Sequence, residues 1–80
     1  MSYFVYILLC SDSTYYTGST SDLQKRVKMH NTTKAGAHYT KIRRPVTLIY
    51  FEVCDSYSRA RKREAEIKRM TKKEKELLAK

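Results

Sequence analysis

The first twenty residues alternate between apolar runs and turn-forming side chains in a way that predicts a β-hairpin. Residues 3–10 are an unbroken series of aromatic, β-branched, leucine and cysteine side chains, which is typical of a strand that is covered on both faces and lies centrally in its sheet. Residues 11–13 favour a turn, and a second strand is expected over residues 14–17, with Gly18 at its end.

A short helix is predicted after the hairpin. Ser21 and Gln24 have the spacing of a capping box, which indicates a helix that begins there and runs to about His30. Leu23 and Val27 would form its apolar face.

The middle of the chain combines an irregular segment with a second apolar run. Residues 31–45 have neither helical nor strand periodicity, and so long a connection in a small domain is more often functional than idle. Residues 46–53 predict a second buried strand.

Two helices are predicted for the last third of the chain. Cap candidates at residues 55–58 introduce a helix that continues to about Met70. Thr71 and Glu74 form a second capping box, so a separate last helix should span residues 72–80. The order β-β-α-β-α-α predicts one α/β domain over residues 1–80, with a three-stranded, mostly antiparallel sheet flanked by helices.

Composition and charge narrow the class of partner. The 80 residues are 41% hydrophobic with two glycines and one proline, as in a globular domain, and no segment approaches the roughly 20 apolar residues that span a bilayer. We therefore expect a soluble, cytoplasmic protein without a membrane partner. The net charge is +9, and every lysine and arginine lies beyond residue 24. This basic surface predicts a polyanionic partner, most simply nucleic acid, although lysines that only aid solubility are the alternative.

An acidic side chain interrupts the apolar face of the predicted third helix. At about 100° per residue, Glu64 lies on the same face as Ala60 and Ile67. A carboxylate in that position requires a metal ion, a salt-bridge partner or a place at the rim of the core. Helix geometry alone leaves these alternatives open.

The first helix and the hairpin offer further polar candidates. Arg26 and His30 are four residues apart and should lie on one side of the helix, where they suit phosphate binding and proton transfer. A surface arginine and a half-buried histidine are the simpler interpretation. Taken singly, Tyr6 and Tyr16 are more simply interpreted as packed core residues. Beside Arg26, His30 and Glu64, their hydroxyls could instead orient or deprotonate a water molecule.

Several of these segments together resemble the GIY-YIG nuclease superfamily, in particular its small stand-alone bacterial members. Val5-Tyr6-Ile7 and Tyr16-Thr17-Gly18 are similar to the two halves of its motif. Residues 22–26 with His30 resemble the first-helix block, and residues 62–68 resemble the metal-binding helix. The resemblance covers essentially the whole chain and implies a GIY-YIG-type α/β sandwich.

The resemblance also implies a reaction, which is hydrolysis of a phosphodiester in nucleic acid with one Mg²⁺ or Mn²⁺ ion. Glu64 would be the metal ligand, and Arg26 would bind the scissile phosphate. Tyr6, Tyr16 and His30 would position or activate the attacking water. DNA is favoured over RNA as the substrate, repair or recombination is the implied process, and a partner protein could direct the enzyme to its target.

The basic segments supply candidates for contacts with the nucleic acid backbone. These candidates are Lys25, Lys34, Tyr39, Lys41, Arg43, Arg44 and Arg63. The competing hypothesis is a non-catalytic nucleic-acid-binding module that keeps the fold and the basic face, with stacking and charge combined on residues 39–44. A protein-interaction domain would require an exposed apolar patch, which the sequence does not indicate.

Overall fold

The computed structural model describes residues 2–32 and 38–80, without the side chains of residues 38 and 39. Its elements in chain order are β1 (Tyr3–Leu9), β2 (Tyr15–Thr20), α1 (Leu23–Thr32), α2 (His38–Lys41), β3 (Thr47–Cys54), α3 (Tyr57–Lys68) and α4 (Lys72–Leu78). The predicted order β-β-α-β-α-α is confirmed. The one-turn helix α2 is an addition, in the segment for which no regular structure was predicted. No helix within the described ranges is long and apolar enough to cross a membrane.

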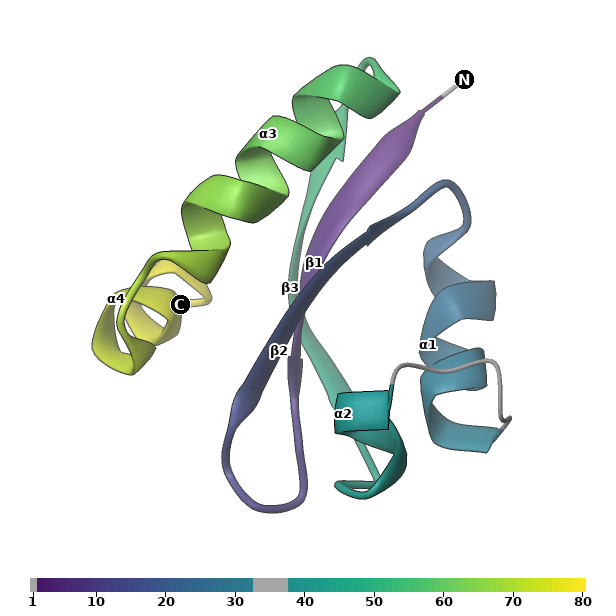
Figure 1. The fold of residues 1–80 in the computed structure, drawn as a ribbon, viewed down its shortest axis with the longest axis vertical. Coiled ribbons are helices and arrows are strands. Elements are labelled where there is room, and N and C mark those ends of the chain that lie inside the picture. Colours follow the sequence, from purple (N-terminus) through teal and green to yellow (C-terminus); the bar gives the residue numbers. More distant parts are fainter. Residues whose placement is uncertain (1, 33–37) are drawn as a thin grey trace.

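The three strands form an antiparallel sheet in the order β2-β1-β3. The unbroken apolar run of β1 predicted a central strand that is covered on both faces. Both parts are confirmed, since β1 lies between β2 and β3 and residues 5–8 are all buried. Helix α1 covers one face of the sheet, and α3 and α4 cover the other (Figure 1). Val5 and Ile7 pack against Ala60 and Ile67 on the α3 face. Tyr6 and Leu8 belong to the core on the α1 face.

Gly18 lies inside β2 and does not end it, contrary to the sequence prediction. It is paired with Tyr6 of β1, and a Cβ atom on Gly18 would lie 2.5 Å from the Tyr6 hydroxyl oxygen and 2.7 Å from Cζ. The glycine is therefore needed for close approach and not for a turn. Its missing side chain allows the Tyr6 ring to lie across β2.

The prediction that β3 is a second buried strand was wrong. Phe51 and Val53 are 50% and 62% exposed, and β3 lies at an edge of the sheet beside β1. A continuous apolar run is compatible with an edge strand when one face packs and the other remains open.

The helix caps agree with the sequence in part. Asp22, and not Ser21, caps α1, since its Oδ1 accepts the backbone N–H of Lys25 at 3.1 Å. A carboxylate at this position also compensates the helix dipole. The capping box of Thr71 and Glu74 is present and starts α4 as predicted.

Candidate active site

A buried chain of hydrogen bonds runs from β1 through α1 to α2. The Tyr6 hydroxyl lies 2.8 Å from Nε2 of His30, and Nδ1 of His30 lies 2.7 Å from Oγ1 of Thr40. His30 and Thr40 are completely buried, and Tyr6 is 1% exposed. Both ring nitrogens of His30 are therefore engaged, so this residue is placed to act through Tyr6 and not directly on a solvent molecule.

Tyr16 completes the aromatic part of the site. Its ring centroid is 5.1 Å from that of His30 and 6.5 Å from that of Tyr6. Tyr6 and His30 meet edge to face, with centroids 5.8 Å apart. The three side chains that the sequence nominated from separate segments are thus in mutual ring contact, which fixes the direction of the Tyr6 hydroxyl.

The surroundings keep His30 neutral. Burial lowers its pKa, and the charges of Arg26 and Arg44 lower it further, to about 4. A neutral imidazole has one nitrogen that can accept a proton. The histidine is therefore available to accept the hydrogen bond of the Tyr6 hydroxyl throughout the neutral pH range.

Burial has the opposite effect on the tyrosine. It raises the pKa of Tyr6 to about 12, although the Arg26 guanidinium acts to lower it. Arg26 alone therefore does not bring the pKa of Tyr6 below its ordinary value. Tyr16 and Glu64 also raise the pKa of Tyr6 electrostatically, so Arg26 and Glu64 both lie within electrostatic range of one hydroxyl.

The neutral state of His30 makes stability depend on pH. The folded pKa of about 4 lies below the ordinary value of 6.5, so the unfolded state binds the proton more readily. The stabilisation is fully present above pH 6.5 and should be lost as the pH falls towards 4, by about 3 kcal/mol in total. Urea unfolding of the wild type and of His30→Gln at pH 7, 5.5 and 4 measures this difference. Parallel pH profiles for the two proteins would contradict it.

Glu64 lies on α3, which covers the face of the sheet opposite to α1 (Figure 1). Its Oε1 accepts a hydrogen bond from Oγ of Ser19 at 2.6 Å, and its Oε2 lies 2.7 Å from Nζ of Lys68, one turn along the helix. The side chain of Glu64 is 14% exposed. Burial acts to raise its pKa, but the hydrogen bonds from Lys68 and Ser19 outweigh burial and hold the pKa below its usual range. Glu64 thus has a salt-bridge partner and lies at the rim of the core, which are two of the three arrangements that the sequence left open.

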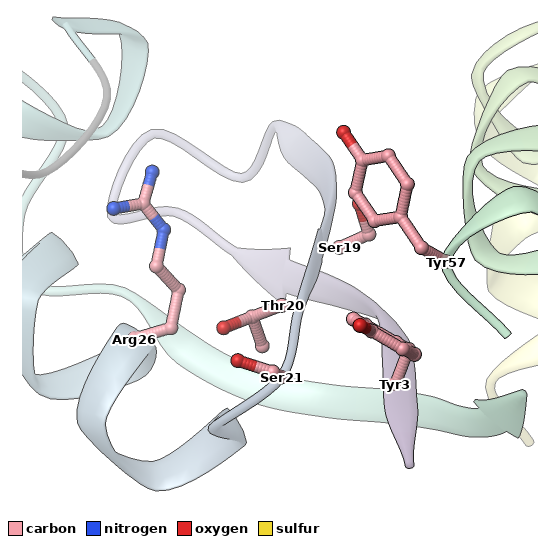
Figure 2. A pocket seen from close by; sticks show the side chains of 6 residues that line it. All are labelled: Tyr3, Ser19, Thr20, Ser21, Arg26 and Tyr57. Atoms are coloured by element: carbon pink, nitrogen blue, oxygen red, sulfur yellow. The ribbon is translucent and has the colours of Figure 1, made fainter. Parts of the chain in front are cut away.

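Arg26 lines a pocket of about 350 Å³ at the edge of β2. In Figure 2 its side chain comes from α1 on one side of this pocket, and Tyr57 comes from the start of α3 on the other. The hydroxyl-bearing residues Ser19, Thr20 and Ser21 lie between them. The pocket thus has one guanidinium and several hydroxyl groups, which are the donors that an anionic oxygen requires.

The predicted contacts with nucleic acid have different surroundings. Lys25 and Lys41 are exposed. Lys34 and the side chain of Tyr39 lie outside the described part of the chain. Arg63 binds Glu52 through two parallel bonds of 2.9 Å, so much of its donor capacity is already used within the protein.

The two loop arginines also have internal partners. Nε of Arg43 binds Asp12 at 2.8 Å, and Arg44 donates to the backbone carbonyl groups of His30 and Met29. Arg44 therefore secures the end of α1 beside the buried histidine. This structural role was not predicted from the sequence.

Sequence reasoning missed Lys68, Ser19 and Thr40, which contact the predicted catalytic residues Glu64 and His30. Lys68 could have been found, because it lies four residues after Glu64 and that spacing favours an ion pair. Ser19 and Thr40 carry no comparable signal. Their positions depend on the strand register and on the path between α1 and β3.

The donor set at Glu64 is compatible with a Mg²⁺ or Mn²⁺ ion. A hard divalent ion is commonly bound by one or two carboxylates and completed by water and substrate phosphate. Glu64 already has a cation at Oε2, and the hydroxyl of Ser19 lies beside it. Within the described ranges, no cluster of three or more histidine, cysteine or acidic side chains forms a closed metal cage. Such an ion would therefore be held by Glu64, with the substrate supplying part of its shell.

Comparison with known proteins identifies the class to which this fold and site belong. The model of the GIY-YIG catalytic domain matches residues 2–77, and the chain belongs to this family, whose domain is nuclease-like. A UPF0213 protein of Syntrophus aciditrophicus is 56% identical over 72 residues, which cover 90% of this chain and 83% of the relative. UPF0213 proteins of Staphylococcus aureus are 51% identical over 74 residues, or 92% of this chain and 89% of theirs.

Two solution NMR structures share the fold. The UPF0213 protein of Bacillus halodurans is 38% identical, with a TM-score of 0.61 over 98% of this chain and 82% of that one. A protein of E. faecalis is 40% identical, with a TM-score of 0.65 over 96% and 81% of the respective chains. The β-β-α-β-α-α sandwich is therefore the fold of these small bacterial proteins.

Proposed function

We propose that this protein is a metal-dependent endonuclease that hydrolyses a phosphodiester bond, in DNA in preference to RNA. The observation that carries the proposal is the 2.8 Å contact between the Tyr6 hydroxyl and the neutral His30, with Arg26 and Glu64 both acting on that hydroxyl. These residues supply a neutral acceptor, a hydroxyl, a guanidinium and a carboxylate, which are the kinds of group that phosphodiester hydrolysis needs.

In this proposal the aromatic chain moves one proton. With the His30 proton on Nδ1, towards Thr40, Nε2 is free to accept the proton of Tyr6. As that proton leaves, the Tyr6 oxygen takes a proton from the attacking water, so Tyr6 need never persist as a phenolate despite its raised pKa. The water oxygen forms a bond to phosphorus, the bond to the leaving oxygen breaks, and solvent protonates that oxygen.

Arg26 and Glu64 have separate roles. Arg26 would bind two oxygens of the scissile phosphate with its planar fork. The bound anion would offset the guanidinium charge that depresses the pKa of His30, which makes proton transfer to the histidine easier. Glu64 would hold the divalent ion, which when bound supplies positive charge for the leaving oxygen.

The Tyr6 hydroxyl provides the direct test. Purified wild type, Tyr6→Phe and Tyr15→Phe would be incubated with Mg²⁺ or Mn²⁺ and duplex DNA, single-stranded DNA, branched DNA and RNA. We expect nicking by the wild type and by the Tyr15→Phe control, and a loss of about 10²-fold or more in Tyr6→Phe, which is the range typical of removing a group that transfers a proton. If no substrate were nicked in the presence of metal, the proposal that this protein is an endonuclease would be rejected.

A non-catalytic nucleic-acid-binding module is the second candidate. The observation in its favour is the ion pair in which Lys68 already neutralises Glu64. Binding of nucleic acid without turnover, and without a change on adding Mn²⁺, would support this candidate.

A further inference from the structure

Lys68 occupies the cation position of the proposed metal ligand. Its ammonium group is 2.7 Å from Oε2 of Glu64, whereas Oε1 is bound by Ser19. The carboxylate is 14% exposed and the Lys68 side chain is 53% exposed. The acid is thus held at the rim of the core, and its counter-ion approaches from the solvent side.

The contact is well suited to being broken. A lysine has a flexible four-carbon stem, and because the Lys68 side chain is half exposed, its ammonium group returns to water when the contact breaks. Lys75 of α4 lies close enough for the two ammonium groups to repel each other: burial lowers the pKa of Lys75, and the charge of Lys68 lowers it further. A third charged partner could therefore draw Lys68 away at small cost.

We propose that Lys68 is an internal counter-ion that competes with the divalent metal for Glu64, and that a nucleic acid phosphate releases this competition by attracting Lys68. The proposal rests on the proposed function in one respect, namely that Glu64 is the metal ligand. Lys68 is a positioning residue in this scheme. It acts through Glu64 and makes metal binding depend on the presence of a polyanion.

The coupling follows from charge and from the shared oxygen. An ammonium group and a divalent ion repel each other when they lie on the same carboxylate, so the ion binds only as Lys68 leaves Oε2. Nucleic acid that binds Lys68 must then tighten metal binding, and metal must tighten nucleic acid binding by the same factor.

Mn²⁺ binding without nucleic acid tests the competition. The measurement is paramagnetic broadening of backbone amide NMR signals around Glu64 in the wild type, Lys68→Gln and Lys62→Gln. Lys62 is exposed on the same helix, so the control removes the same charge elsewhere. We expect Lys68→Gln to bind Mn²⁺ about two- to fivefold more tightly than the control, as expected for loss of a weak competing ion pair. Equal affinities in the two variants would overturn the competition.

A second titration tests the coupling to nucleic acid. Duplex DNA would be added in a Tyr6→Phe background, which slows turnover by about 10²-fold or more and retains Glu64 and Lys68. DNA should raise the Mn²⁺ affinity of the protein that contains Lys68, and should raise that of Lys68→Gln several-fold less. An equal rise in both proteins would overturn the release by phosphate.

Glu64→Gln separates the two proposals. Unchanged broadening in this variant would remove Glu64 as the ligand and would reject both the metal role and the competition. Competition at Glu64 in a protein that nicks no substrate would support the counter-ion and reject the nuclease. Nicking that depends on Glu64, with equal Mn²⁺ affinity in Lys68→Gln and Lys62→Gln, would support the nuclease and reject the counter-ion.

Discussion

Glu64→Gln is expected to abolish metal-dependent nicking at any practical Mg²⁺ or Mn²⁺ concentration, while changing the free energy of unfolding by no more than about 1 kcal/mol. Glutamine keeps the shape and can still accept the hydrogen bond from Ser19, but it lacks the charge that a hard cation requires. The loss of stability is small because the ion-pair partner, Lys68, is half exposed. Its ammonium returns to water and is not left buried without a partner.

The matched control for this substitution is Glu66→Gln. Glu66 lies on the same helix, and its side chain is 51% exposed and 3.9 Å from Arg63. Thermal melting and nicking assays on both variants separate the possible roles. Glu66→Gln should retain activity, and neither variant should melt far below the wild type. If Glu64→Gln lowered the free energy of unfolding by about 3 to 5 kcal/mol, as for a broken buried pair, the main role of Glu64 would be structural.

The parts of the fold that were predictable are those determined by local pattern. The apolar run of β1 indicated a central strand, and Thr71 with Glu74 indicated the start of α4, because each depends on neighbours within a few residues. Gly18 was misread for the complementary reason. Glycine is compatible with a turn or with close approach, and only the pairing with Tyr6 decides between them.

From residue spacing alone, site residues could be placed side by side only where a helix sets that spacing. Arg26 and His30 are four residues apart on α1, so their shared side followed from helix geometry. The complete burial of His30 did not follow, because it depends on Tyr6, which is 24 residues away, and on Thr40 beyond the end of the helix. The exposure of the apolar side chains Phe51 and Val53 on β3 was also missed. The order of apolar residues along one strand does not tell where that strand lies in the sheet.

The second large effect is expected for Arg26→Lys, which should lose turnover by about 10²-fold or more while retaining most of the nucleic acid affinity. The loss is that typical of removing one preorganised donor to a developing charge. Lysine keeps the positive charge that lowers the pKa of His30 and of Tyr6, so the buried hydrogen-bond chain should be unchanged. It lacks the planar fork that can bind two phosphate oxygens in the pocket at the edge of β2.

Arg69→Lys, an exposed change of the same kind after α3, is the control. Single-turnover nicking rates and binding measured at one salt concentration distinguish the two effects. Full turnover in Arg26→Lys would show that the phosphate is held by another group.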